Sequence, residues 1–194
     1  MRGPLLDHNG DDTDEGATRA RLYDVAAPRP TATRHRDRAE SKSRIGVGRP
    51  RPPCLVADPR RVEVRRGALL IADTEGAYRV LETASPPTFY LPPDDVRMEW
   101  LELEPGGSLC EWKGHAQYLA LRANETTIEH VAWCYPRSRQ YFQAIAGYVA
   151  FYPVKVECYV AGERVRPQAG DYYGGWVTDE IVGPHKGEPG TNGW

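Results

Sequence analysis

The chain has 194 residues and a formal net charge of −2 at pH 7, which suit one domain of ordinary size without a strong field of either sign. Nucleic-acid-binding proteins usually present a strongly basic surface, so we expect no nucleic-acid partner. No run of about 18 consecutive apolar residues occurs, so we expect no membrane-spanning helix and no membrane partner.

The first residues, "MRGPLLDHNGDDTDEG", lack the apolar segment of a secretory signal and turn acidic at once. We therefore expect a cytoplasmic protein. Thiols stay reduced in that compartment, so the four cysteines are predicted to be free. They are Cys54, Cys110, Cys134 and Cys158.

Residues 1–50 are rich in Arg, Pro, Ser and Gly and contain few apolar side chains. Such a composition buries too little apolar surface to offset the entropy of ordering the chain. We expect a disordered tail in front of a single folded domain, residues 51–194. An arm that grips an anionic polymer is the alternative interpretation, and the composition favours the solvated tail.

From about residue 55 the pattern takes the period of two that is typical of strands. The predicted strands, in chain order, are "RVEVR", "ALLIA", "AYRVLE", "TFYL", "VRMEWLEL", "AQYLALRA", "TIEHVAWCY", "VKVECYV" and "RVR". Turn-forming residues separate them at Arg65-Arg66-Gly67, at Asn124-Glu125 and in the "AGE" segment, where we expect hairpins. The predicted class is mainly β.

One stretch departs from this pattern, because apolar residues recur at i, i+3, i+4 and i+7. They are Phe142, Ile145, Ala146 and Val149. The spacing predicts one short amphipathic helix that starts near Ser138 and ends before Pro153. After residue 170 the chain is dense in glycine and aromatic residues, and we expect an irregular segment that packs Tyr172, Tyr173 and Trp176 against the sheet.

The stretch "CEWKGHAQY", residues 110–118, follows the Gly106-Gly107 turn and precedes a predicted strand, so it lies at the rim of a sheet, where functional loops are common. Beside Trp112, the Lys113 ammonium would hold a phosphate or carboxylate, or would act as a base or nucleophile if its pKa were lowered. Lys113 would also make Cys110 more reactive by stabilising its thiolate. The plainer interpretation is a buried thiol and a lysine whose stem covers Trp112.

Cys110, His115, His130 and Cys134 have the side chains that zinc prefers. Their spacings, Cys-x4-His and His-x3-Cys, do not match the paired ligands of structural zinc sites. We therefore expect no metal and no cofactor.

Aromatic residues give the strongest functional signal. The chain has five Trp and eleven Tyr against three Phe, and Trp and Tyr combine an apolar body with a polar tip that suits the walls of a pocket. Core packing is the alternative for any one of them. The candidate ligand-binding residues are Tyr90, Cys110, Trp112, Lys113, Tyr118, Trp133, Tyr135, Tyr152 and Trp176.

Several longer motifs, among them "RVLETASPPTFYLPPDDVRMEWL", "CEWKGHAQY", "AWCYP", "IAGYVAFYP" and "YYGGWVTDEIVGPHKGEPGTNGW", make the chain resemble the domain of unknown function 427 family over about residues 51–194. The resemblance implies a compact two-sheet fold similar to the β-tent of Mss4-like proteins. It also brings a nucleotidyltransferase label. The "PGGSL" turn fits such an enzyme, but the acidic pair that would hold its catalytic metals does not follow.

Three hypotheses follow. The first is a small-molecule binding module with an aromatic pocket, in which Lys113 anchors an anionic or carbonyl-bearing ligand. The second is an enzyme of unknown reaction that uses Lys113 or Cys110. The third is a scaffold whose aromatic residues only form core and interface.

Overall fold

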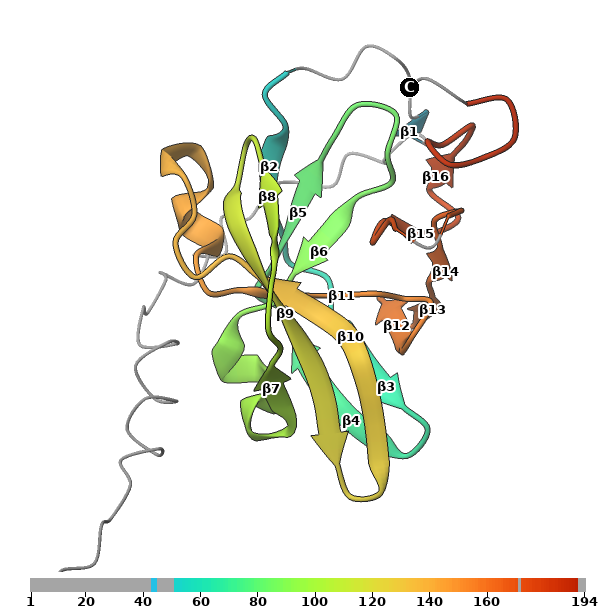
Figure 1. Cartoon of the computed structure of the whole chain (residues 1–194). Helices are drawn as coiled ribbons and strands as arrows, with labels where there is room; N and C mark the ends of the chain where they lie inside the picture. The colour runs from blue at the N-terminus through green and yellow to red at the C-terminus, as the bar shows by residue number, and fades with distance from the viewer. Residues whose placement is uncertain (1–42, 45–50, 171, 192–194) are drawn as a thin grey trace, which may run out of the picture.

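A computed structural model describes residues 43–44, 51–170 and 172–191, and its secondary structure is mainly β, as predicted (Figure 1). The strands are β1 Ser43–Arg44, β2 Cys54–Asp58, β3 Val62–Arg66, β4 Leu69–Thr74, β5 Ala77–Leu81, β6 Thr88–Tyr90, β7 Leu101–Leu103, β8 Ser108–Cys110, β9 Gly114–Ala123, β10 Thr126–Cys134, β11 Val149–Phe151, β12 Glu157–Val160, β13 Glu163–Arg164, β14 Arg166–Pro167, β15 Trp176–Val177 and β16 Ile181–Val182. Three short 3-10 helices are η1 Pro93–Asp95, η2 Met98–Trp100 and η3 Gln140–Ile145.

The strands form three main antiparallel sheets. The largest has the order β11-β10-β9-β7, with β8 also paired to β9. A four-stranded sheet has the order β13-β12-β3-β4, and a three-stranded sheet has the order β2-β5-β6. Leu91 and Val149 exchange two backbone hydrogen bonds of 2.8 and 2.9 Å, so the end of β6 is joined to the start of β11. The largest and the three-stranded sheets therefore meet at a fixed position.

All three predicted hairpins are present, since β3 pairs with β4, β9 with β10 and β12 with β13. Their turns place Gly67, Asn124, Ala161 and Gly162 at positive φ. Glycine adopts that region freely and asparagine more readily than most residues, so the turn residues recognised in the sequence are those that reverse the chain.

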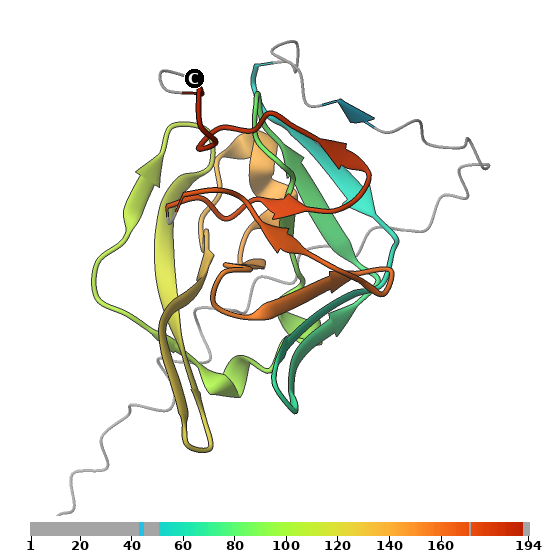
Figure 2. The ribbon, with the colours of Figure 1, turned by 90° about the vertical axis from the view of Figure 1, so that its right-hand side faces the viewer.

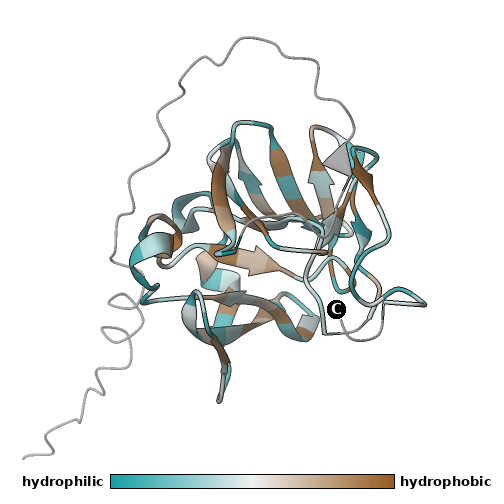
Figure 3. Cartoon of the chain, turned by 90° about the horizontal axis from the view of Figure 1, so that it is seen from above, coloured by the Kyte–Doolittle hydropathy of each residue, from teal (hydrophilic) through white to brown (hydrophobic). Residues whose placement is uncertain are grey.

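The largest sheet has a different core on each of its two faces, because successive side chains of a strand point to opposite sides. Figure 3 colours the strands by hydropathy, and hydrophobic residues recur along them. One face carries mostly aliphatic residues, including Leu119, Leu121 and Val149, and packs into the main core. The other face carries Tyr118, Trp133 and other aromatic residues, which belong to a second cluster with Tyr90 of the three-stranded sheet. The alternation thus gathers the aromatic side chains between two sheets.

Two predicted elements differ from the structure. The helix expected from Ser138 to before Pro153 is a 3-10 helix confined to Gln140–Ile145, because Val149 begins strand β11 and pairs with β10. The apolar spacing that suggested a longer helix arises because Phe142 and Ile145 are buried in the aromatic cluster. In "VRMEWLEL" the first part forms η2 and only Leu101–Leu103 is a strand.

The predicted disordered tail, residues 1–50, lies outside the described residues apart from Ser43–Arg44, which pair in parallel with β16. No helix in the part of the chain that the structure describes is both long and apolar enough to cross a membrane.

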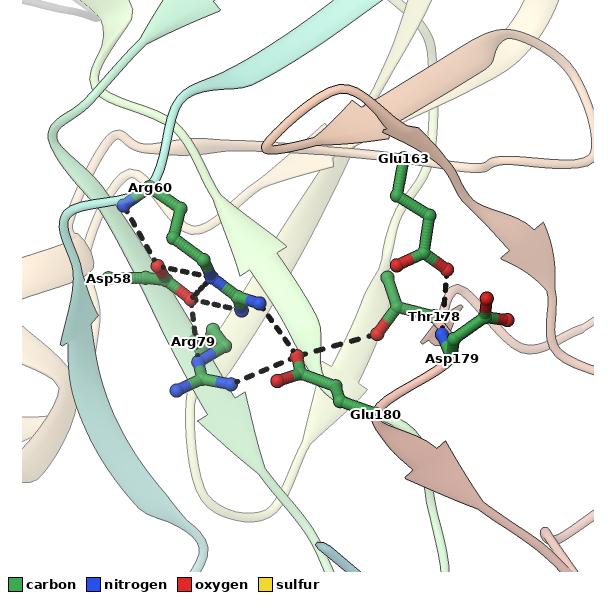
Figure 4. A network of polar contacts seen from close by, with 7 residues as sticks. All are labelled: Asp58, Arg60, Arg79, Glu163, Thr178, Asp179 and Glu180. Carbon is green, nitrogen blue, oxygen red and sulfur yellow. Dashed lines mark hydrogen bonds and ion pairs between the residues drawn. The ribbon is translucent and has the colours of Figure 1, made fainter. Parts of the chain in front are cut away.

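A network of ion pairs fastens the C-terminal segment to the three-stranded sheet (Figure 4). The Asp58 side chain at the end of β2 is only 1% exposed and accepts hydrogen bonds from Arg60, with Nη2 at 2.7 Å from Oδ2. Its Oδ2 also pairs with Nε of Arg79 at 2.8 Å. Glu180, which immediately precedes β16, pairs with both arginines at 2.9 and 3.5 Å. The segment that follows β15 is therefore held against β2 and β5.

Replacing Asp58 by Asn should lower the free energy of unfolding at pH 7 by about 3 kcal/mol, because two partly buried arginines lose a charged partner. Burial acts to raise the pKa of Asp58, but Arg60 and Arg79 outweigh it and the pKa is lowered. The stabilisation should therefore be complete above about pH 4 and decline as the pH falls further through the lowered pKa. Urea unfolding of both proteins from pH 3 to 7 measures this difference.

Asp73→Asn is the matched control, because Asp73 pairs with the more exposed Arg61 at 2.6 Å and should contribute much less. Equal losses of stability in the two variants would contradict the role given to the Asp58 network.

Candidate functional site

A cavity of about 230 Å³ lies between the largest sheet and the three-stranded sheet. Tyr118 of β9 and Trp133 of β10 stand directly opposite each other in the sheet and line it together. Tyr135 lies two residues after Trp133, and Tyr152 lies two residues after Ala150, which is the partner of Trp133 in β11. Side chains two residues apart point to the same side of a strand, so both tyrosines lie on the face of Trp133 and line the cavity. The register of the backbone therefore sets four aromatic side chains along one wall.

The opposite wall comes from the three-stranded sheet and the chain beside it. Tyr90 ends β6 and lines the cavity with Thr88; Glu82 follows directly after β5, and Ser85 lies between β5 and β6. Tyr90 meets the ring of Trp133 edge-on, with centroids 6.3 Å apart, and its hydroxyl accepts a hydrogen bond of 3.4 Å from Nε1 of Trp133. The two walls therefore contact each other at the aromatic cluster.

The C-terminal segment adds a third side. In Figure 2 it crosses in front of the space between the β9–β10 hairpin and strands β2 and β5. Gln168, Tyr172, Tyr173, Gly174 and Gly175 line the cavity from this segment. Tyr172 is 77% exposed and Leu109 of β8, also a lining residue, is 63% exposed, so these two side chains mark the mouth.

The segment "CEWKG" is the tight turn of the β8–β9 hairpin, in which Cys110 pairs with Gly114. Gly114 has a φ of +103°, as expected for the glycine that closes a three-residue hairpin loop. The carbonyl of Lys113 accepts a hydrogen bond of 3.1 Å from the backbone of Arg139. This contact holds the turn against the chain before η3, and the Lys113 side chain is buried and lines the cavity.

Lys113 forms an ion pair with Glu82 across the cavity wall. Its side chain is only 7% exposed, and its Nζ also lies 5.8 Å from the ring centre of Phe142. Burial acts to lower the pKa of Lys113, but the charge and hydrogen bond of Glu82 outweigh burial, and the pKa is raised above its ordinary value. The amine is therefore charged at neutral pH, which argues against a lysine base or nucleophile there.

Three of the tyrosines that line the cavity have a raised pKa and are neutral at pH 7. Burial raises the pKa of Tyr90 and Tyr135, and it raises the pKa of Tyr152 to about 12. Tyrosine hydroxyls in this state both donate and accept hydrogen bonds. They add polar atoms to the wall without adding charge.

The structure brings seven of the nine candidate residues into the lining of one cavity. They are Tyr90, Cys110, Lys113, Tyr118, Trp133, Tyr135 and Tyr152. Trp112 packs beside the aromatic cluster outside the lining. Trp176 is fully buried in the main core, where it stacks on Phe89 at 4.8 Å and donates a hydrogen bond of 3.1 Å to the carbonyl of Phe151.

Reasoning from sequence missed Glu82, Gln168 and the hydroxyls of Ser85, Thr88 and Ser108. Nothing near Glu82 in the sequence marks it as the partner of a lysine 31 residues later. The Gly174-Gly175 pair did carry a signal, because consecutive glycines beside aromatic residues suggest close backbone approach.

The possible zinc ligands do not assemble. Cys134 is buried in the aliphatic core, and His130 lies at a bulge in β10, where its Nδ1 is 3.3 Å from Glu104. Across residues 51–170 and 172–191 no three His, Cys, Asp or Glu side chains group so as to hold a metal ion.

The model of one protein family, described as Domain of unknown function (DUF427), matches residues 54–162. The chain belongs to this family. The matched part of this DUF427 member supplies the aromatic wall, Lys113 and Glu82, whereas Gln168 and residues 172–175 of the lining come after it. The model's name also carries a nucleotidyltransferase label. No curated protein matches the chain.

Gly174 allows the C-terminal segment to lie directly on Trp133. A Cβ at this position would sit 2.2 Å from Cη2 of the indole, closer than side chains approach each other. Gly174→Ala should therefore displace the Trp133 ring and lower the free energy of unfolding by about 1–3 kcal/mol. Near-ultraviolet circular dichroism and urea unfolding measure the two effects.

Gly76→Ala is the control, because a Cβ there meets its neighbours at ordinary contact distances of 3.5 Å and more. An unchanged aromatic spectrum in Gly174→Ala would show that the segment does not rest on Trp133.

Proposed function

We propose that this DUF427 protein binds a small organic molecule in the aromatic cavity, with Lys113 as its polar anchor. The observation that carries the proposal is the convergence of a buried ammonium group and several aromatic side chains on one cavity with an exposed mouth. Ligand sites typically combine apolar and aromatic walls with a few polar groups.

The volume indicates the size of ligand. A cavity of about 150 Å³ is enough to hold benzene, so about 230 Å³ suits a molecule of one or two rings. The ring pairs Trp133–Tyr152, at 4.5 Å, and Tyr90–Tyr135, at 6.3 Å, present both faces and edges to such a guest.

Lys113 supports the anchor role because it is buried and charged. An ammonium group has three donors, and Glu82 is its hydrogen-bond acceptor within the described chain. A carbonyl or carboxylate on the ligand would accept from the remaining donors. Charge-assisted hydrogen bonds are stronger than those between neutral groups.

The enzyme hypothesis, with Cys110 as nucleophile or with the nucleotidyltransferase reaction, and the scaffold hypothesis stay predictions. So do the cytoplasmic location and the absence of a nucleic-acid partner. The raised pKa of Lys113 supports binding over a proton-abstracting role, since a protonated amine cannot act as a base.

Titration of the full chain with benzamide, benzoate, phenol and 2-pyridone tests the proposal. At least one compound should shift the indole Nε1–H resonance of Trp133 saturably, with that resonance assigned through Trp133→Phe. Lys113→Met, which keeps an apolar stem and removes the donor, should weaken this binding by about tenfold or more.

Lys155→Met is the control, since Lys155 also lies over an aromatic ring, that of Tyr152 at 6.0 Å, but does not line the cavity. Both variants are first checked for native near-ultraviolet spectra. The proposal fails if none of the compounds produces a saturable shift, or if Lys113→Met binds as well as the unmodified protein.

A further inference from the structure

The charges of the cavity cancel. Of its described lining residues, Glu82 and Lys113 carry formal charges at neutral pH, and they are paired with each other. The other lining groups are aromatic rings, hydroxyls, a thiol, an amide, a leucine side chain and glycines. A ligand entering this site therefore meets a dipole and not a net positive charge.

Both members of the pair line the cavity, and each has more hydrogen-bonding positions than their mutual contact uses. Glu82 accepts from Lys113 through Oε1, and a carboxylate has about four lone-pair positions. The Glu82 side chain is 38% exposed against 7% for Lys113, so the carboxylate is the more solvent-accessible member of the pair. A donor and an acceptor thus stand side by side on the wall.

We propose that the cavity selects a neutral, planar ligand that presents an amide edge, a C=O beside an N–H, to this pair. The carbonyl accepts a hydrogen bond from Lys113, and the N–H donates one to Glu82. The inference rests on the proposed function and gives the chemical class of its ligand.

Electrostatics favours such a ligand over a charged one. A carboxylate or phosphate would gain from Lys113 but would be brought close to the Glu82 carboxylate, and like charges in a partly dry site repel strongly. A cation would meet the same conflict with Lys113. A neutral edge satisfies both groups without breaking the ion pair, in the way that paired donors and acceptors read a base edge.

Three single-ring probes of similar size separate these cases. 2-Pyridone carries the amide edge, N-methyl-2-pyridone blocks its N–H, and benzoate carries a negative charge. For the full chain, with the Trp133 indole resonance as the readout, we expect 2-pyridone to bind about tenfold tighter than either of the others.

Glu82→Gln tests the role of the carboxylate. It leaves Lys113 without its opposite charge, so the affinity for benzoate should rise by about tenfold and the preference for 2-pyridone should be lost or reversed. Glu111→Gln is the control, because it also removes one negative charge, in the β8–β9 turn that carries Lys113, but at an exposed residue that does not line the cavity. It should leave all three affinities unchanged.

Benzoate or N-methyl-2-pyridone binding as tightly as 2-pyridone would overturn this inference and leave the proposed function standing. An unchanged order of affinities in folded Glu82→Gln would overturn it as well. If that variant does not fold, the comparison of the three probes on the unmodified protein decides. If no compound of either panel shifts the Trp133 resonance, both the inference and the proposed function fall.

Discussion

The alternation of side chains along the largest sheet is the constraint on which the rest of the structure depends. Because β9, β10 and β11 are paired in register, each residue of one strand fixes the face on which its partners lie. Aliphatic residues fall on one side and aromatic residues on the other. A shift of one residue in any of these strands would exchange the two sets. The aromatic wall is thus a property of the backbone hydrogen bonding and not of a flexible loop.

The ion pair between Lys113 and Glu82 adds a second link between the sheets, through the β8–β9 turn on one side and the end of β5 on the other. An ion pair between a buried and a half-exposed charge contributes little net stability, because desolvation of the buried member offsets much of the attraction, and apolar residues of similar size often serve equally well. Packing alone therefore gives no reason for a lysine at this position. A function that needs a charged donor next to a carboxylate does give one.

Much of the fold could be predicted from the sequence, because turns and strands are local. Gly67, Asn124 and the Ala161–Gly162 pair mark hairpins that the structure contains. The helix was overestimated, because the period of four apolar residues reflected burial in two different elements, η3 and β11. Candidate site residues could be chosen by type alone, but the choice could not separate Trp133, in the cavity, from Trp176, in the core. Glu82 could not be found at all, since only the tertiary fold brings it to Lys113.

The parts of the cavity are held with different strength. The aromatic wall and the ion pair are built on paired strands and on a turn fixed by the Arg139 backbone. The third side follows β14 and has few strand contacts of its own. It is fixed instead by the close approach of Gly174 to the Trp133 ring and by the Gln168 side chain, which donates a hydrogen bond of 2.7 Å to the carbonyl of Lys186. Farther along the chain, the Asp58 network holds it through Glu180. Local opening is cheapest where backbone pairing is sparse. If the cavity binds a ligand as proposed, its entry would therefore displace residues 172–175 before it disturbed the aromatic wall.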